Sequence, residues 1–157
     1  MAWRLFGAAA HAPKGTLVYM DIGIGAEEKP AGWVVFELFD KKVPRTCRNF
    51  LTLLTRDSKS YKGSTFHRAI PGVLVQGGDV LNGDGTGNEA ADGGLFQDEN
   101  YLYQHDTEGI LSMANDGPNT NGSQFFVTTQ EAPFFDDKYV AFGRVVEGMS
   151  TIAKIER

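Results

Sequence analysis

The sequence has almost no cysteine, no long apolar run and no excess of basic residues. Cys47 is the only cysteine among the 157 residues, so no disulfide can form within the chain, which is typical of a reducing compartment. No apolar run approaches the roughly 20 residues that a membrane-spanning helix needs. The formal net charge is -5 and no basic block stands out, which argues against nucleic acid as a partner. The length fits one compact domain.

The N-terminus contains basic residues but no acidic ones. No Asp or Glu precedes Asp21, whereas Arg4, His11 and Lys14 lie before it. We expect residues 1–15 to be an extension and residues 16–157 to be the domain. The alternative is a short transit peptide, which would direct the protein to mitochondria; without one, the single cysteine favours the cytoplasm or the nucleus.

Short apolar segments with alternating patterns predict many strands and two helices. The predicted strands cover residues 18–24, 33–39, 65–70, 73–76, 111–114, 125–129 and 140–146. Residues 29–32 form the predicted turn between the first two strands. Cys47, Phe50, Leu51 and Leu54 form one apolar helical stripe behind Pro44, and residues 148–157 predict a second helix. Residues 77–94 are rich in glycine and predict a loop. This pattern favours a barrel plugged at its ends by helices.

Cofactor and nucleophile motifs do not fit the sequence. The segment Gly83–Gly87 lacks the lysine of a phosphate-binding loop, and carboxylates surround it. The acidic residues of this region do not have calcium-loop spacing, and the three histidines are too scattered to predict a zinc site. Ser123 is not in the Gly-x-Ser-x-Gly motif of a hydrolase. We therefore expect no cofactor and no metal, and any catalysis must be non-covalent.

Two segments carry the strongest signal. Residues 66–79 read FHRAIPGVLVQGGD, and residues 109–126 read GILSMANDGPNTNGSQFF. Together they resemble the two signature blocks of the cyclophilins, and the likeness runs in order from about Val18 to Glu147. The resemblance implies a mainly β fold, a closed eight-stranded antiparallel barrel capped by two α-helices. It also implies a peptidyl-prolyl cis-trans isomerase that binds proline-containing peptides and assists protein folding.

The physics of X-Pro isomerisation defines the groups that such a site needs. Rotation about the imide bond has a barrier of about 18–20 kcal/mol, and a catalyst must favour the twisted state. A permanent hydrogen-bond donor near the prolyl nitrogen and an apolar surface for the ring would do so. The guanidinium of Arg68 suits the donor role. By resemblance, Arg68 is the catalytic arginine, Gln76 binds the substrate carbonyl and Asn115 pairs with the peptide backbone.

The resemblance also assigns the residues that surround the substrate. Leu74, Phe126 and Phe134 would line the proline pocket, although plain core packing would also explain them. The complete predicted substrate-binding set is His67, Val73, Leu74, Gly85, Ala114, Thr120, Gln124, Phe126, Phe134, Phe135 and Tyr139.

Four positions depart from the best-known active cyclophilins. Val73 replaces a phenylalanine of the proline pocket, Phe134 a tryptophan, Tyr139 a histidine and Asp116 a small residue. Loss of the phenyl ring at position 73 removes apolar contact worth on the order of 1 kcal/mol. Phe134 has no indole N–H for cyclosporin. We therefore predict reduced isomerase activity and weak cyclosporin binding.

The end of the chain is a further departure, since cyclophilins usually continue into a last strand that helps to close the barrel. Either the sequence is truncated after Arg157 and the barrel lacks that strand, or another segment covers the open edge. The extension before Thr16 and a partner chain are the candidates. A second functional hypothesis follows: a cyclophilin fold that serves as a binding or scaffold subunit of a larger assembly, with little catalysis.

Overall fold

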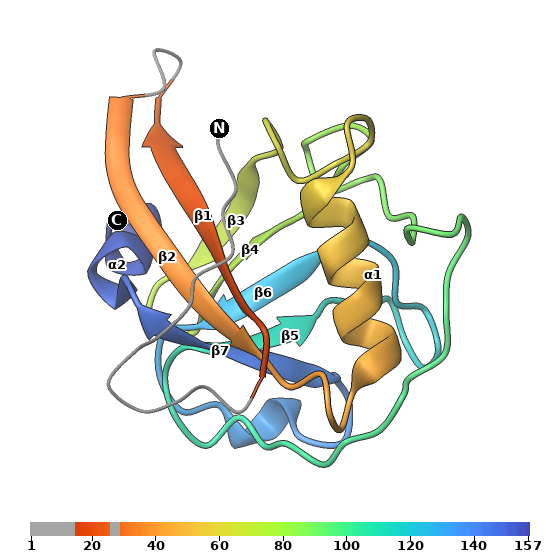
Figure 1. Ribbon diagram of the computed structural model, residues 1–157. Helices are drawn as coiled ribbons and strands as arrows, with labels where there is room; N and C mark the ends of the chain where they lie inside the picture. The colour runs from red at the N-terminus through yellow and green to blue at the C-terminus, as the bar shows by residue number, and fades with distance from the viewer. Residues whose placement is uncertain (1–14, 26–28) are drawn as a thin grey trace.

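The computed structural model describes residues 15–25 and 29–157 as a curled antiparallel sheet with two helices (Figure 1). The predicted extension and transit peptide lie almost entirely outside these residues. The seven strands follow the order β1-β2-β7-β5-β6-β4-β3. Their bounds are β1 Leu17–Ile24, β2 Lys29–Leu38, β3 Phe66–Ile70, β4 Leu74–Gly77, β5 Ile110–Met113, β6 Phe125–Thr128 and β7 Ala141–Glu147. The helices are α1 Pro44–Thr55 and α2 Met149–Glu156, with a short 3-10 helix, η1, at Pro133–Phe135.

The mainly β architecture with two α-helices is confirmed, whereas the closed eight-stranded barrel is not. In the described part of the chain, β1 pairs with β2 and β3 pairs with β4, and no pairing joins β1 to β3. The sheet is therefore a half-barrel of seven strands whose two ends are β1 and β3.

The turn predicted at residues 29–32 is wrong, because β2 already begins at Lys29. Pro30 lies opposite Gly23, just beyond a register shift between Ile22 and Gly23. β7 pairs with β2 only from Val35 onward, so this part of β2 has one neighbour. A proline, which lacks the N–H, is tolerated in such a position.

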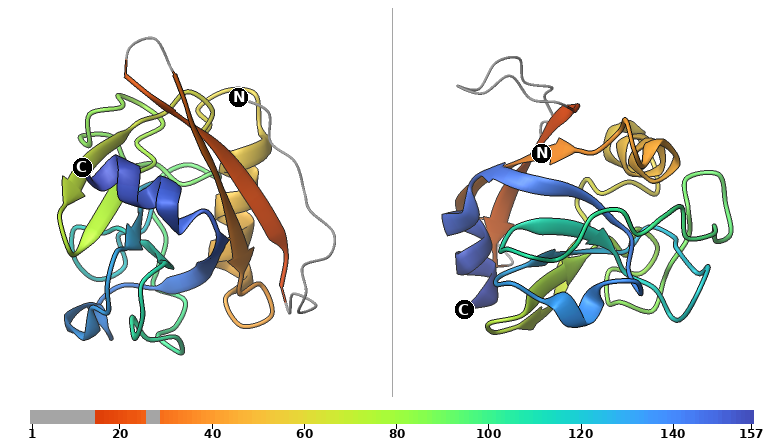
Figure 2. Two further views of the ribbon diagram at one scale, coloured as in Figure 1. Left: turned by 90° about the vertical axis from the view of Figure 1, so that its left-hand side faces the viewer. Right: turned by 90° about the horizontal axis from the view of Figure 1, so that it is seen from below.

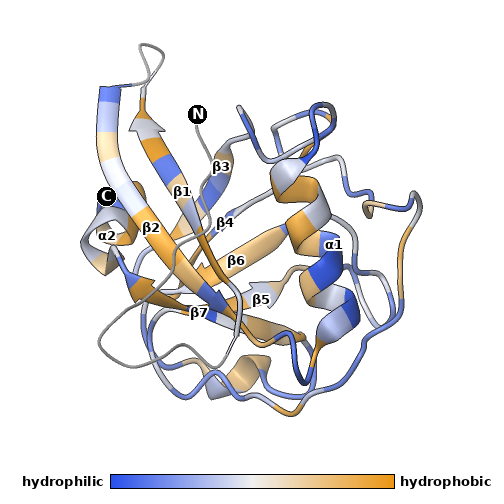
Figure 3. Ribbon diagram, viewed as in Figure 1, coloured by the Kyte–Doolittle hydropathy of each residue, from blue (hydrophilic) through white to orange (hydrophobic). Residues whose placement is uncertain are grey.

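The main core lies between the concave face of the sheet and α1. Cys47, Phe50 and Leu54 are buried and Leu51 packs against the same cluster, which confirms the predicted stripe. Phe50 is central, because four aromatic rings have centroids 5.0–6.4 Å from its own: Phe36, Tyr61, Phe125 and Phe142. Figure 3 shows hydrophobic colouring on β6 and on the middle of β2.

A distant carboxylate caps α1. Val43 at the N-cap has no side-chain capping bond, but Glu99 accepts hydrogen bonds from the backbone N–H groups of Arg45 and Thr46, both 2.8 Å long. A carboxylate here satisfies unpaired donors and complements the positive end of the helix dipole.

The second helix lies between the two ends of the curled sheet (Figure 2). α2 contacts β2, β3 and β4, and Ile152 is fully buried. Gly148 precedes the helix with φ of 95°, and a Cβ there would lie 2.2 Å from the Trp33 carbonyl oxygen. Neither helix of the described chain is long and apolar enough to cross a bilayer.

Candidate functional site

Four side chains form a row across the outer face of the sheet. Arg68 in β3 is the register partner of Gln76 in β4, Gln76 is the partner of Phe126 in β6, and Phe126 is the partner of Ser112 in β5. Directly opposed residues of antiparallel strands point to the same face. The row therefore places a cation, an amide and an aromatic ring side by side.

An apolar cluster separate from the main core surrounds Phe126. Leu74, Ala114 and Phe126 are buried in it, and Ile70, Val73, Phe135 and Tyr139 pack against them half-buried. The Phe126 ring lies 5.0 Å from that of Phe135 and 5.4 Å from that of Tyr139. Phe134 continues the cluster to the surface: its ring lies 4.5 Å from Phe135, and it is 53% exposed.

A polar hollow of about 380 Å³ adjoins this cluster. Ala114 belongs to both, and Arg68 and Gln76 line the hollow. The distance from Arg68 Nη1 to Gln76 Oε1 is 3.5 Å, so the guanidinium keeps most of its donors for other partners. The predicted residues His67, Gly85, Asn115 and Gln124 line the same hollow.

A chain of amides fixes Gln76. Its Nε2 donates to Gln124 Oε1 over 3.0 Å. Gln124 Nε2 in turn donates to the carbonyl oxygens of Gly85 at 2.9 Å and Gly87 at 2.8 Å. Because Gln124 is buried, these bonds settle the orientation of both amides and leave one Gln76 N–H for a ligand.

The glycine-rich loop is organised around the buried carboxylate of Asp79. Four backbone N–H groups donate to it over 2.9–3.0 Å, from Leu81, Asn82, Gly85 and Gly87. Burial by itself would raise the pKa of Asp79, but the four hydrogen bonds together hold that pKa well below its usual range. The loop conformation that carries Gly85 therefore depends on an ionised side chain.

Gly85 and His67 are in close contact. Gly85 has φ of 96°, and a Cβ there would lie 2.7 Å from His67 Cδ2. A side chain at position 85 would therefore be strained and would displace the imidazole.

The loop after β5 uses its own polar groups. Asn115 Nδ2 donates to the Lys138 carbonyl oxygen over 2.9 Å, and Asn115 Oδ1 accepts the Gly117 N–H over 3.1 Å. The Thr120 hydroxyl accepts the Asp116 N–H and donates to the Gly117 carbonyl. These side chains shape the loop, and both polar atoms of the Asn115 side chain are already engaged within the chain.

Sequence reasoning did not assign Asp84, Thr86 and Asn88 to the site, although they line the hollow. Asn88 Oδ1 accepts the N–H groups of Ser123 and Gln124 at 2.9 and 3.2 Å. The sequence predicts only a loop here, because the contacts that bring these residues to the hollow join the loop to Ser123 and Gln124, far along the chain.

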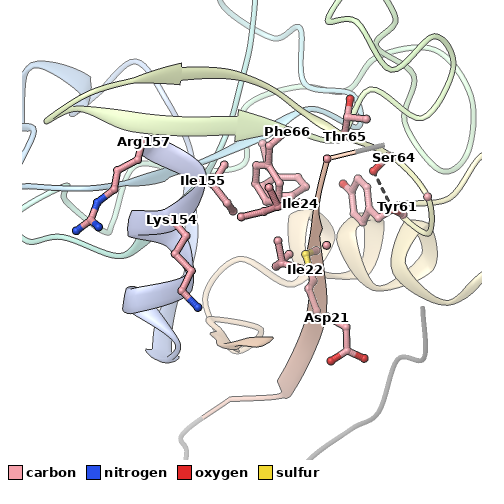
Figure 4. Close-up of a pocket in the computed structure, with 16 residues that line it drawn as sticks. Asp21, Ile22, Ile24, Tyr61, Ser64, Thr65, Phe66, Lys154, Ile155 and Arg157 are labelled. Carbon is pink, nitrogen blue, oxygen red and sulfur yellow. Dashed lines mark hydrogen bonds between the residues drawn. The ribbon is translucent and has the colours of Figure 1, made fainter. Parts of the chain in front are cut away.

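A cavity larger than this hollow lies elsewhere in the described part of the chain, between the two ends of the sheet. It has about 610 Å³ and lies between β1 and β3 (Figure 4). Its walls are formed by Ile22 and Ile24 of β1, Phe66 of β3 and Lys154 and Ile155 of α2. None of the predicted site residues lines it. We take the row that contains Arg68 as the candidate site, because the predicted residues lie in and around that row and not in this cavity.

Cys47 is not a nucleophile. Its side chain is buried, and burial, followed by the charges of Asp40 and Glu99, raises the pKa of the thiol to about 12. The thiol therefore stays protonated at neutral pH.

One comparison with known proteins bears on these observations. A family model described as "Cyclophilin type peptidyl-prolyl cis-trans isomerase/CLD" matches residues 19–157. The match runs from within β1 to the last residue and contains the whole row, the apolar cluster and the polar hollow.

Proposed function

The chain belongs to the family of cyclophilin-type peptidyl-prolyl cis-trans isomerases, and from this we propose that it isomerises X-Pro bonds at the row formed by Arg68, Gln76 and Phe126. The observation that carries the proposal is the register across β3, β4 and β6. This register places the permanent charge of Arg68 beside the Gln76 amide and the apolar ring of Phe126. The substrate class is proline-containing peptides and proteins.

In the proposed mechanism no covalent bond forms. The proline ring packs against Leu74 and Phe126, which are both buried at the centre of the apolar cluster. The remaining N–H of Gln76 donates to the substrate carbonyl, and the main chain of Asn115 pairs with the peptide. As the imide twists, its nitrogen becomes pyramidal and accepts a hydrogen bond from Arg68. Because that bond exists only in the twisted state, it lowers the barrier and leaves the energy of the ground state unchanged.

We expect a Val73→Phe substitution to increase kcat/KM on an X-Pro peptide about fivefold. Val73 packs half-buried against the cluster of Leu74 and Phe126, and a phenyl ring adds apolar contact worth about 1 kcal/mol. The gain should appear mainly as a lower KM, measured by exchange NMR or a protease-coupled assay. The control is Val146→Phe, because Val146 of β7 is exposed and also gains a phenyl ring. Equal activity of Val73→Phe and the unsubstituted chain would show that activity is not limited at this position.

We expect weak cyclosporin binding, and Phe134→Trp to strengthen it about fivefold. Phe134 is exposed at the rim of the cluster, where an indole N–H adds one hydrogen bond, worth about 1 kcal/mol. Calorimetric titration gives the Kd, and Phe134→Leu, which removes the ring, serves as the control. Tryptophan and phenylalanine variants of equal affinity would contradict this account.

The second candidate function is that of a binding subunit in a larger assembly. One observation favours it: the cavity between β1 and β3, which lies away from Arg68. A partner segment could pair with the strand edges there. Arg68→Ala separates the two functions, because an enzyme loses turnover while a subunit that uses this edge keeps its partner. Residence in the cytoplasm, nucleus or mitochondria stays a prediction from the sequence.

A further inference from the structure

A fully buried histidine lies directly behind the proposed proline-binding surface. His105 has no exposed surface, and both ring nitrogens have partners. Nδ1 lies 2.8 Å from Asp136 Oδ1, and Nε2 lies 3.1 Å from the Ser112 hydroxyl oxygen. Burial lowers the pKa of His105, opposed by the nearby Asp136 carboxylate. The neutral ring then donates from Nδ1 to the carboxylate and accepts the Ser112 hydroxyl at Nε2.

The backbone of the same residue holds both ends of η1. The His105 carbonyl oxygen accepts the N–H of Ala132, which precedes η1, over 2.7 Å. The His105 N–H donates to the carboxylate of Asp136, which follows η1, also over 2.7 Å. Since η1 carries Phe134 and Phe135, the position of these two rings depends on residue 105.

The imidazole also contacts the aromatic rings of the site. Its centroid lies 5.9 Å from that of Phe126, with the planes 18° apart. It meets Phe135 edge-on at 5.7 Å. Ser112, which anchors the imidazole, is the next member of the row beyond Phe126. The histidine is therefore joined to β5, β6 and η1, the three elements that frame the apolar cluster.

The order Ser112, His105, Asp136 resembles a hydrolytic triad, but it cannot act as one. Ser112 and His105 are both fully buried, so no substrate carbonyl can reach the hydroxyl. These groups can affect catalysis only through the residues that they hold.

We propose that His105, held by Asp136, is a positioning residue that fixes the orientation of the Phe126 ring and the position of η1. Through these two elements it determines the shape of the surface that receives the proline ring. The inference rests on the proposed function of that surface. His105 itself touches no substrate. The binding of proline should therefore depend on it, while the hydrogen bond from Arg68 should not.

The test compares the steady-state kinetics of folded variants on one X-Pro peptide. His105→Phe keeps a flat ring but loses both polar contacts, and Asp136→Ala removes the acceptor. We expect each to lower kcat/KM about tenfold, mainly by raising KM. Asp136→Asn keeps an oxygen acceptor and should restore at least half of the activity. The control is Asn49→Ala in α1, which also loses buried hydrogen bonds but lies away from the cluster; it should stay within twofold of the unsubstituted chain.

The kinetic result overturns the proposal if His105→Phe and Asp136→Ala retain the KM of the Asn49→Ala control. A general loss of stability would affect all three variants and leave KM unchanged in the folded fraction. Should both variants fail to fold, Ser112→Ala removes only the Nε2 partner and should raise KM about threefold. An unchanged KM in that variant would equally reject the proposal.

A second readout does not depend on activity. In NMR spectra of protein with labelled phenylalanine, the ring signals of Phe126 and Phe135 should shift in Asp136→Ala and return toward their original positions in Asp136→Asn. If the unsubstituted chain shows no isomerase activity, the proposed function fails, and these signals still decide the positioning role. Ring signals that do not change in Asp136→Ala would refute it.

Discussion

Arg68→Ala is expected to lower kcat/KM on an X-Pro peptide by about 100-fold or more. Removal of one preorganised donor to the charge that develops in a transition state typically has an effect of this size. The Arg68 side chain is exposed, and its one hydrogen bond to Gln76 is 3.5 Å long, so its loss should hardly change the stability of the fold. The hydrogen bond to the prolyl nitrogen exists only in the twisted state. We therefore expect kcat to decrease and KM to stay nearly unchanged.

Two further variants make the Arg68 experiment specific. Arg68→Lys keeps the charge but loses the directed fork of N–H groups, so an intermediate loss of about tenfold is expected. Arg48→Ala is the matched control, because Arg48 is a surface arginine with a 3.7 Å ion pair to Asp92 and lies on α1, away from the row. Turnover by Arg68→Ala equal to that of Arg48→Ala would rule out the proposed mechanism.

Asp79→Asn is expected to reduce the free energy of unfolding at pH 7 by about 3 kcal/mol. The buried carboxylate accepts four backbone N–H groups, and hydrogen bonds to a charged group are worth about 1.5–3 kcal/mol each. The carboxamide keeps one oxygen and places an N–H₂ group among donors. Gly85 and Gly87 donate their N–H groups to Asp79 and accept hydrogen bonds from Gln124 at their carbonyl oxygens. The residues that line the hollow beside Arg68 should therefore become less ordered as well. Denaturant unfolding measures the loss.

The effect of Asp79 on stability should depend on pH with a definite sign. The folded-state pKa of Asp79 lies below its unfolded value, so its contribution is fully present above the unfolded pKa of about 3.9. It is lost as the pH falls below that value toward the folded-state pKa. The stability difference between Asp79→Asn and the unsubstituted chain should therefore be constant from pH 6 to 8 and shrink in acid. Asp92→Asn is the control, because Asp92 is largely exposed; a difference that persists unchanged at pH 2 would contradict the role of the charge.

Local pattern was enough to predict most of the secondary structure. The predicted strands match β1 and β3 to β7 closely, and the apolar stripe of α1 is buried as expected. The two motif segments identified the family, and they include Arg68, Gln76 and Phe126. These features depend on residue type and short spacing, which are properties of the chain itself. The turn at residues 29–32 failed because nothing local shows that β2 has only one neighbour there.

Tertiary structure decided how these residues meet. The sequence places Arg68, Gln76, Ser112 and Phe126 in four strands, but only the register of β3, β4, β6 and β5 aligns them in one row. The tertiary structure likewise brings His105 to Asp136, 31 positions apart, and Glu99 to the N-terminus of α1, 54 positions away. The sequence predicted an open edge, but only the fold shows that the two ends of the sheet are β1 and β3. Periodicity records which face of a strand is apolar, but the register depends on pairing between distant segments, whose energies no short window of sequence contains.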